Sequence, residues 1–308
     1  MTLPAPFARF VAPAQARAHL WRIPLALAVV AACHGLMLAA LTGTLRLLHG
    51  PEGAATLARI ARGDSPGAVV VLLASFAGLF LGIALAVRLV HGRGFGTLIG
   101  RGAVALRHFV LGLGLFGALY ALGLPLFRLA TLVVPGLEAL EVWPGIPPLL
   151  WLAWLIPALL VLAIQTGTEE LIFRGYLQQQ LAARFASPVI WALLPSAAFG
   201  LLHYDPAMAG ANVWLIVGVT GLFGLIAADL TARSGTLGLA WGLHFANNFV
   251  ALALIAPLGN LGGLALFRVP FGMDDTGPMR LALAADVVIL VGAWVLARIW
   301  LARSRDTA

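Results

Sequence analysis

The chain has no lysine, a single cysteine and few charges of either sign. Its 308 residues include 19 basic residues, all arginine, and 12 acidic ones, so charged residues make up only 10%. Soluble domains carry about 25% charged residues, which excludes an ordinary soluble protein. Cys33 cannot form an internal disulfide, and we interpret it as a small buried side chain. The arginines form no basic tract, so the net charge of +7 does not indicate nucleic acid as a partner.

Long apolar runs dominate the rest of the sequence, which is 61% hydrophobic. A membrane-spanning helix needs about 20 mostly apolar residues. The fold class predicted is therefore an all-α polytopic membrane protein, a bundle of about eight transmembrane helices. The candidate spans are at about 23–43, 67–87, 106–125, 147–168, 188–203, 212–231, 236–256 and 281–301. Paired glycines, Gly78 with Gly82 and Gly238 with Gly242, predict close packing between helices.

The arginines also predict an orientation. Eight crossings put both termini on one side, and if that side is the cytoplasm, thirteen of the 19 arginines lie inside. We therefore expect a multi-pass protein of the plasma (cell inner) membrane whose N- and C-termini both lie in the cytoplasm. The predicted organisation is a cytoplasmic tail at 1–22, three transmembrane helices in 23–140 and a four-helix core in 145–256. An outer loop, the last transmembrane helix and a cytoplasmic tail then occupy 257–308.

Two adjacent glutamates, Glu169 and Glu170, follow a stretch that is apolar over 146–164, and Arg174 comes one turn after Glu170. A charge in the middle of a membrane helix costs about 2.5–3.5 kcal/mol even on the mildest scale. Residues retained at such a cost predict a function or a structural ion pair. Because residues four apart share a helix face, Glu170 and Arg174 can pair, while Glu169 lies about 100° around the helix.

Histidines stand on two later apolar segments, His203 on one and His244, with Asn248 one turn after it, on another. The polar turn near 186–187 is about equally far from Glu169 and from His203, so an antiparallel hairpin brings these two to the same height. A carboxylate in a low-dielectric pocket can act as a general base toward water. Histidine and asparagine can donate hydrogen bonds to an oxyanion. The lone Cys33 precedes these segments by more than a hundred residues and no nucleophile elbow accompanies them, which favours an activated water over a covalent intermediate.

Three motifs occur in order on these segments: Glu-Glu-x-x-x-Arg from Glu169, Phe-x-x-x-His from Phe199 and His-x-x-x-Asn from His244. Together they resemble the CAAX protease and bacteriocin-processing (CPBP, ABI) family of intramembrane glutamic endopeptidases. The resemblance covers about residues 146–256, and no motif position departs from the pattern.

The resemblance implies a role for each motif residue. Glu169 would be the catalytic base, His203 would assist it, and His244 with Asn248 would form the oxyanion site. The supporting ion pair would be Glu170 with Arg174. The resemblance implies no cofactor and no metal, and an active site open to the cytoplasm. It also implies a membrane-associated protein or peptide substrate, with or without a prenyl group.

Other interpretations remain open at this point. Glutamate and histidine are ordinary zinc ligands, so the same set could serve a zinc metalloprotease, although His-Glu-x-x-His is absent. A non-catalytic bacteriocin-immunity or scaffold protein and a proton-relaying transporter are the remaining alternatives. Outside the motifs, Asp286 is interpreted as an interfacial or packing residue, and Asp229 as the local partner of Arg233.

Overall fold

The computed structural model describes residues 3–133, 142–259 and 261–304. Helices dominate this part of the chain, and six of them are long and apolar enough to cross a membrane. They are Arg22–Arg62, Pro66–His91, Gly102–Leu126, Pro148–Ala182, Pro206–Ser234 and Thr276–Arg303. The polytopic α-helical fold predicted from the sequence is thus confirmed.

Two of the eight predicted spans form shorter helices. The segment predicted at 188–203 is an apolar helix over Val189–Leu201. The segment predicted at 236–256 is helical over 238–254 and then enters a strand. Most of the second one is buried by other helices, so it need not match the full thickness of the hydrocarbon. The count of eight crossings therefore stays a prediction.

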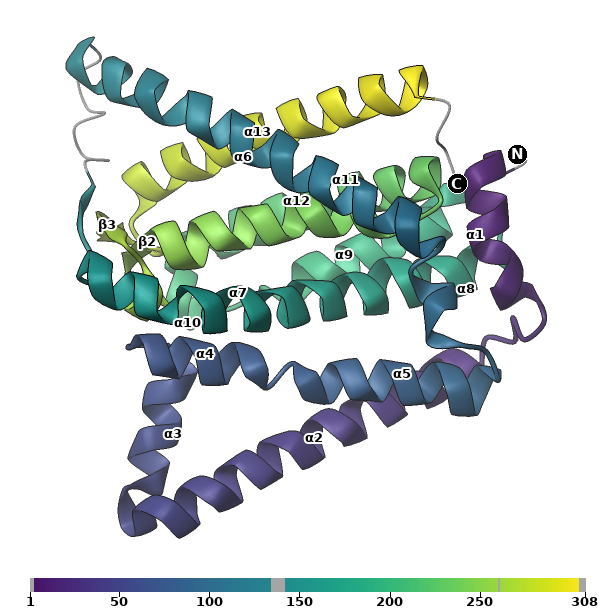
Figure 1. Ribbon diagram of the computed structural model, residues 1–308, viewed down its shortest axis with the longest axis horizontal. Helices are drawn as coiled ribbons and strands as arrows, with labels where there is room; N and C mark the ends of the chain where they lie inside the picture. Colours follow the sequence, from purple (N-terminus) through teal and green to yellow (C-terminus); the bar gives the residue numbers. More distant parts are fainter. Residues whose placement is uncertain (1–2, 134–141, 260, 305–308) are drawn as a thin grey trace.

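The N-terminal half contains the helices α1 to α6, joined by two 3₁₀ turns. Figure 1 shows α2 and α5 running side by side, with α3 joining α2 to α4 across one end. A Cβ atom on Gly78 or Gly82 of α5 would meet the backbone of α2 within about 3 Å, which confirms the close packing predicted from this pair. The elements are α1 (Ala5–Gln15), α2 (Arg22–His49), η1 (Gly50–Glu52), α3 (Gly53–Arg62), α4 (Pro66–Ala74), α5 (Ala77–His91), η2 (Phe95–Leu98) and α6 (Gly102–Val133).

Helix α1 lies in the segment that the sequence predicts as a cytoplasmic tail. Its apolar residues Phe7, Phe10 and Val11 fall on one face and are buried. The Phe7 ring lies 4.8 Å from that of Trp191, centroid to centroid. The predicted tail therefore includes a docked helix, which covers one end of the bundle.

A buried polar group fastens this helix to the bundle. Gln179 donates through Nε2 to the carbonyl oxygens of Phe10 (2.5 Å) and Thr97 (2.9 Å). Arg93 donates to the Oε1 atom of the same glutamine. Burial lowers the pKa of the Arg93 guanidinium to about 10. The Gln179 side chain thereby joins α1 and η2 to the start of α8, whose bounds are Gln179–Ala182.

The C-terminal half carries the three motifs. Three of its helical segments, η4, η5 and η7, have the wider π geometry, which often marks functional sites. The elements are α7 (Pro148–Glu170), η4 (Leu171–Gln178), α8 (Gln179–Ala182), η5 (Val189–Leu193), α9 (Leu194–Leu201), α10 (Pro206–Ala209), η6 (Gly210–Asn212), α11 (Val213–Ser234), α12 (Gly238–Phe249), η7 (Val250–Leu254), η8 (Gly262–Leu264) and α13 (Thr276–Arg303).

A small sheet closes one end of the bundle, with one strand before α7 and two between α12 and α13, and only the later part of it falls in the predicted outer loop. Its strands are β1 (Trp143–Pro144), β2 (Ile255–Leu258) and β3 (Phe267–Gly272), in the order β1-β3-β2. β1 pairs antiparallel with β3, and β2 pairs parallel with it. The sheet turns the chain from the end of α12 toward the start of α13.

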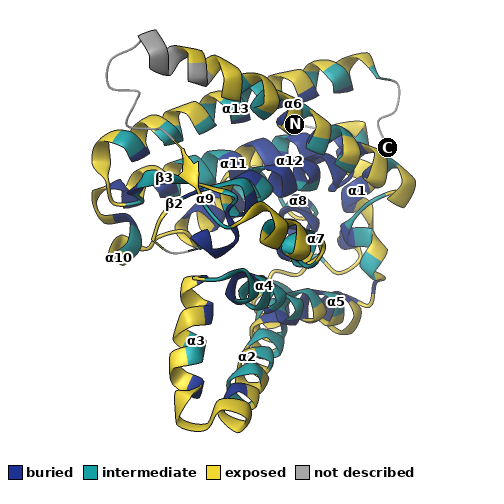
Figure 2. Cartoon of the chain, turned by 60° about the vertical axis from the view of Figure 1, so that its left-hand side comes forward, coloured by how far each residue is buried: buried dark blue, intermediate teal, exposed yellow. Residues whose placement is uncertain are grey.

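Helix α12 occupies the centre of the molecule. It packs against α6, α7 and α11, and Figure 2 shows its residues mostly buried while α2 and α3 are largely exposed. Gly235, in the left-handed region at φ 69°, ends α11 and reverses the chain into α12. A Cβ on Gly238 or Gly242 would collide with the backbone of α6. The predicted glycine contact therefore exists, and it brings the third motif into the interior.

The outer helices expose large apolar side chains. Examples on four helices are Leu36 of α2, Leu122 of α6, Ile156 of α7 and Val288 of α13, each more than 60% exposed. Soluble monomers rarely expose apolar surface on this scale. In a membrane protein, these side chains face lipid.

Candidate active site

The first motif lies where α7 passes into η4. Glu170 is fully buried, and its Oε1 atom accepts a hydrogen bond from Arg174 at 2.9 Å. The Arg174 guanidinium also lies 4.7 Å from the Phe199 ring centroid and 5.6 Å from that of Phe223. The ion pair expected from the spacing is present, and it is buried beside aromatic rings.

His244 of α12 joins both glutamates. Its Nδ1 atom lies 2.8 Å from Oε1 of Glu170, and its Nε2 atom lies 3.4 Å from Oε2 of Glu169. Ionised carboxylates only accept hydrogen bonds, so both ring nitrogens donate when both contacts are made. Arg174 offsets one of the two glutamate charges, and His244 offers a ring nitrogen to each carboxylate, so neither acid is left without a partner.

Gln165 connects the first and third motifs, and sequence reasoning missed it. Its side-chain amide donates to Oε1 of Glu169 at 2.7 Å and accepts from Nδ2 of Asn248 at 3.0 Å. It is buried and lies one turn before Glu169 on α7. That spacing of four was the available signal, because residues four apart on a helix can bond.

His203 lies two residues after the end of α9 at Leu201. Its Nδ1 atom lies 3.0 Å from the carbonyl oxygen of Phe199. A carbonyl can only accept, so Nδ1 carries a proton in this contact, and in a neutral ring Nε2 is then the acceptor. The Phe-x-x-x-His spacing thus sets the direction of the ring.

A small cavity brings the histidines together. It has a volume of about 70 Å³, which admits water, since one water needs only about 10–15 Å³ on this measure. Three of the four residues predicted as catalytic line it, and the fourth, Glu169, contacts His244 beside it. The lining residues are Phe199, His203, Val219, Thr220, Phe223, His244, Asn247, Asn248, Asp286 and Leu290.

Asp286 is the acidic residue of this lining, and it comes from α13. Its Oδ1 atom accepts a hydrogen bond from the hydroxyl of Tyr120 on α6 at 2.9 Å. The sequence interpretation as an interfacial or packing residue is therefore incomplete, since the carboxyl borders the cavity. No spacing rule could have linked Asp286 to motifs more than thirty residues away.

The sequence argument put His203 at the height of the glutamates, and that height stays a prediction. The imidazole that contacts Glu169 is that of His244. His203 lines the same cavity, and the Phe199 ring centroid lies 5.1 Å from the His203 ring and 5.9 Å from the His244 ring. The chemical inventory is a carboxylate acceptor, two imidazoles and an asparagine amide around a space for water.

Comparison with known proteins agrees with the motifs. Residues 148–250 match the family described as type II CAAX prenyl endopeptidase Rce1-like, which confirms the resemblance drawn from the sequence. The uncharacterized protein YyaK of Bacillus subtilis (strain 168) is 35% identical over 147 residues, or 46% of this chain and 47% of YyaK. The chain thus spans about half the length of this curated relative. No solved structure matches at a significant level.

Proposed function

We propose that the chain is a membrane-embedded endopeptidase that hydrolyses a peptide bond with a water activated by Glu169. The observation that carries this proposal is the contact between Glu169 and His244 beside a cavity lined by His203 and Asn248. These residues come from three separate motifs. The family match supports a CAAX-protease-like membrane peptidase. The glutamic mechanism and the residue roles are our proposal.

In this mechanism Glu169 acts as the general base. Its Oε1 atom is held by Gln165, and its Oε2 atom faces His244. A water in the cavity gives a proton to this carboxylate while its oxygen attacks the carbonyl carbon of the substrate. The carbon–nitrogen bond then breaks, and the departing amine receives that proton. His203, which keeps Nε2 as an acceptor, orients the water.

The tetrahedral intermediate needs hydrogen-bond donors at its oxyanion. Asn248 uses one amide hydrogen on Gln165 and keeps the other for substrate. His244 donates Nδ1 to Glu170, so its Nε2 atom, 3.4 Å from Oε2 of Glu169, would donate to the oxyanion once Glu169 has taken the proton from water. The Glu170–Arg174 pair then has a definite task, because it fixes the ring of His244.

We further propose that the site opens to the cytoplasm in the cell inner membrane. The substrate would be a membrane-associated protein or peptide, with or without a prenyl group. The family match supports substrates at the membrane.

The test compares protein termini in membranes and secreted peptides from cells that express the intact chain, Glu169→Ala or His203→Ala. We expect termini that appear with the intact chain and with Glu52→Gln, an exposed acid in η1, but with neither site variant. The same termini at full level with correctly inserted Glu169→Ala protein would reject the proposal. A cellular phenotype rescued by Glu169→Gln would favour a non-catalytic role.

A chelator distinguishes the proposed glutamate mechanism from that of a zinc metalloprotease. The described residues contain no group of three or more histidine, cysteine, aspartate or glutamate side chains arranged to hold a metal ion. If Glu169 alone activates the water, cleavage by purified protein continues in the presence of a chelator. Stoichiometric zinc in the purified protein, with activity lost on chelation, would favour the metalloprotease.

A further inference from the structure

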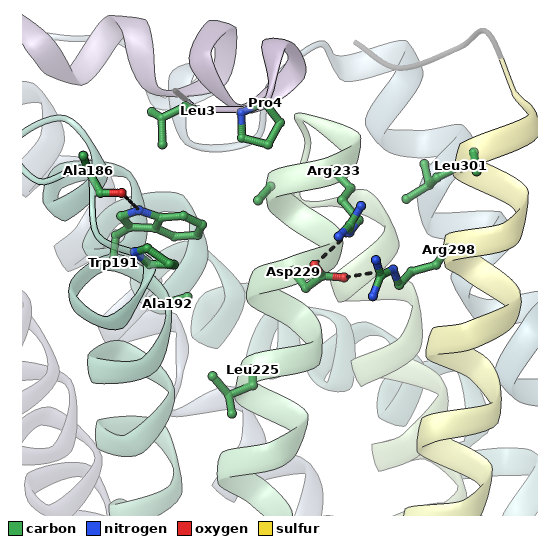
Figure 3. A pocket seen from close by; sticks show the side chains of 13 residues that line it. Leu3, Pro4, Ala186, Trp191, Ala192, Leu225, Asp229, Arg233, Arg298 and Leu301 are labelled. Atoms are coloured by element: carbon green, nitrogen blue, oxygen red, sulfur yellow. Dashed lines mark hydrogen bonds and ion pairs between the residues drawn. The ribbon is translucent and has the colours of Figure 1, made fainter. Parts of the chain in front are cut away.

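A second and larger cavity lies at the opposite end of α11 from its start at Val213, away from the proposed catalytic residues. Its volume is about 570 Å³, within the range of about 300–1,000 Å³ of ligand pockets. Figure 3 shows it between the α9 segment, α11 and α13, with the N-terminal segment above it. The lining residues are Leu3, Pro4, Ala186, Pro188, Trp191, Ala192, Leu225, Asp229, Ala232, Arg233, Arg298, Leu301 and Ala302.

Two arginines in this lining share one acid. Arg233 donates through Nε to Oδ1 of Asp229 at 2.8 Å, and Nε of Arg298 lies 3.8 Å from Oδ2. Trp294 also donates to Oδ2, at 2.9 Å. Figure 3 shows both guanidinium groups reaching toward this carboxylate. The group carries a net charge of +1, and within the described residues the terminal nitrogens of both arginines make no hydrogen bond.

The depth of the cavity relates it to the bilayer. Arg233 is the residue before the end of the span that finishes at Ser234, and Arg298 lies in the last turns of the span that finishes at Arg303. Lipid headgroups lie at the ends of such spans. Leu225 also lines the cavity and is about 12 Å deeper along α11 than Arg233. The cavity therefore runs from headgroup level to acyl-chain level.

We infer that this cavity binds an anionic phospholipid. The phosphate would lie between Arg233 and Arg298, and an acyl chain would follow the apolar wall formed by Leu225, Trp191 and Ala192. Guanidinium groups bind phosphate well, and basic pockets between membrane helices bind anionic headgroups. A peptide fits less well, because apart from these arginines and Asp229 the lining side chains are apolar, and they would leave the polar groups of a peptide backbone without partners. The inference does not depend on the proposed peptidase activity.

The test uses the full chain in nanodiscs of phosphatidylcholine with increasing phosphatidylglycerol, and counts bound phosphatidylglycerol by native mass spectrometry. We expect retention of phosphatidylglycerol over phosphatidylcholine. The Arg233→Gln/Arg298→Gln double variant should bind it about 30-fold more weakly. The matched control is Arg59→Gln/Arg62→Gln, because these arginines also share one acid, Asp64, at 3.5 and 3.6 Å but line neither cavity.

The Asp229→Asn variant should change the affinity for phosphatidylglycerol in the opposite direction. A gain in affinity could not result from misfolding, so this variant keeps the test valid if the double variant folds poorly. It removes the competing carboxylate, so phosphatidylglycerol should bind more tightly than to the intact chain. Unchanged binding in Asp229→Asn would overturn the inference, as would equal retention of the two lipids by the intact chain. Inorganic phosphate that binds as tightly as phosphatidylglycerol would also overturn it, since the site would then recognise a soluble anion.

Discussion

At the scale of single residues, one carboxylate oxygen of Glu170 connects the ion pair to the catalytic histidine proposed above. Oε1 of Glu170 receives both Arg174 and His244, so the orientation of the imidazole depends on an ion pair that does not touch the cavity. The spacing in the sequence predicted the pair with Arg174. It could not predict the bond to His244, because 74 residues separate the two and helix spacing carries no information between helices.

Arg174→Met should destabilise the protein strongly. Glu170 would remain fully buried without its guanidinium partner, and breaking a buried pair in this way costs about 3–5 kcal/mol. Arg233→Met is the matched control, because it breaks a pair with the same spacing whose side chains are 43% and 30% exposed. That change should cost less than about 1 kcal/mol. The thermal midpoint in detergent measures both, and equal losses would contradict the burial argument.

Gln165→Ala should slow catalysis more than it lowers stability. The change frees both Glu169 and Asn248, and a displacement of about 1 Å at a reacting group can reduce the rate about 100-fold. The rate constant for cleavage is measured with a synthetic peptide that spans a cleavage site identified in the comparison of protein termini under Proposed function. Gln178→Ala serves as control, because this equally buried glutamine bonds to the Ala228 carbonyl. If both variants lose the same activity per folded molecule, Gln165 has no positioning role.

At the scale of elements, the long apolar helices could be predicted, because hydropathy over about 20 residues is a local property. The small sheet could not. Its strands are two to six residues long and pair Trp143 with Arg268, far apart in the sequence. The docking of α1 was not predicted either, because its apolar face packs against α8 and α11, which are distant in the sequence.

Gly238→Ala should destabilise the contact between α12 and α6. The new methyl group would collide with the backbone of Ala105, and overpacking costs about 1–3 kcal/mol. Gly218→Ala in α11 is the control, because nothing lies within 4 Å of its Cβ position. Alanine favours a helix over glycine by about 1 kcal/mol, so this control should hold or raise the thermal midpoint. Midpoints that shift downward together would argue against a specific contact.

At the scale of the whole molecule, α1 and the end of α13 lie at the same end of the bundle (Figure 1). This arrangement agrees with termini on one side of the membrane, and the side itself stays a prediction from the arginine distribution. Reading three motifs together predicted residues that the structure brings close to one cavity, and their catalytic roles stay a prediction. Asp286 and Tyr120 were not predicted there, because no motif or helix spacing links α13 and α6 to the three motifs.

Single cysteines introduced in a Cys33→Ala background test the orientation. Gly94 and Gly277 are exposed, have free space at the Cβ position and follow or begin helices at opposite ends of the bundle. A membrane-impermeant maleimide should label the Gly277→Cys variant in intact cells. It should label the Gly94→Cys variant only after permeabilisation. The reverse pattern would invert the orientation, and labelling of both from outside would disprove the predicted crossings.

The glycine contact between α12 and α6 has a consequence for protein engineering. The matched residues 148–250 contain α12 but not α6, whose carbonyl groups lie directly against Gly238 and Gly242. Grafting only that segment into another membrane protein would leave the two glycines facing acyl chains. A chimera that exchanges both helices together should retain the native interhelical distance, and with it the depth at which the third motif sits.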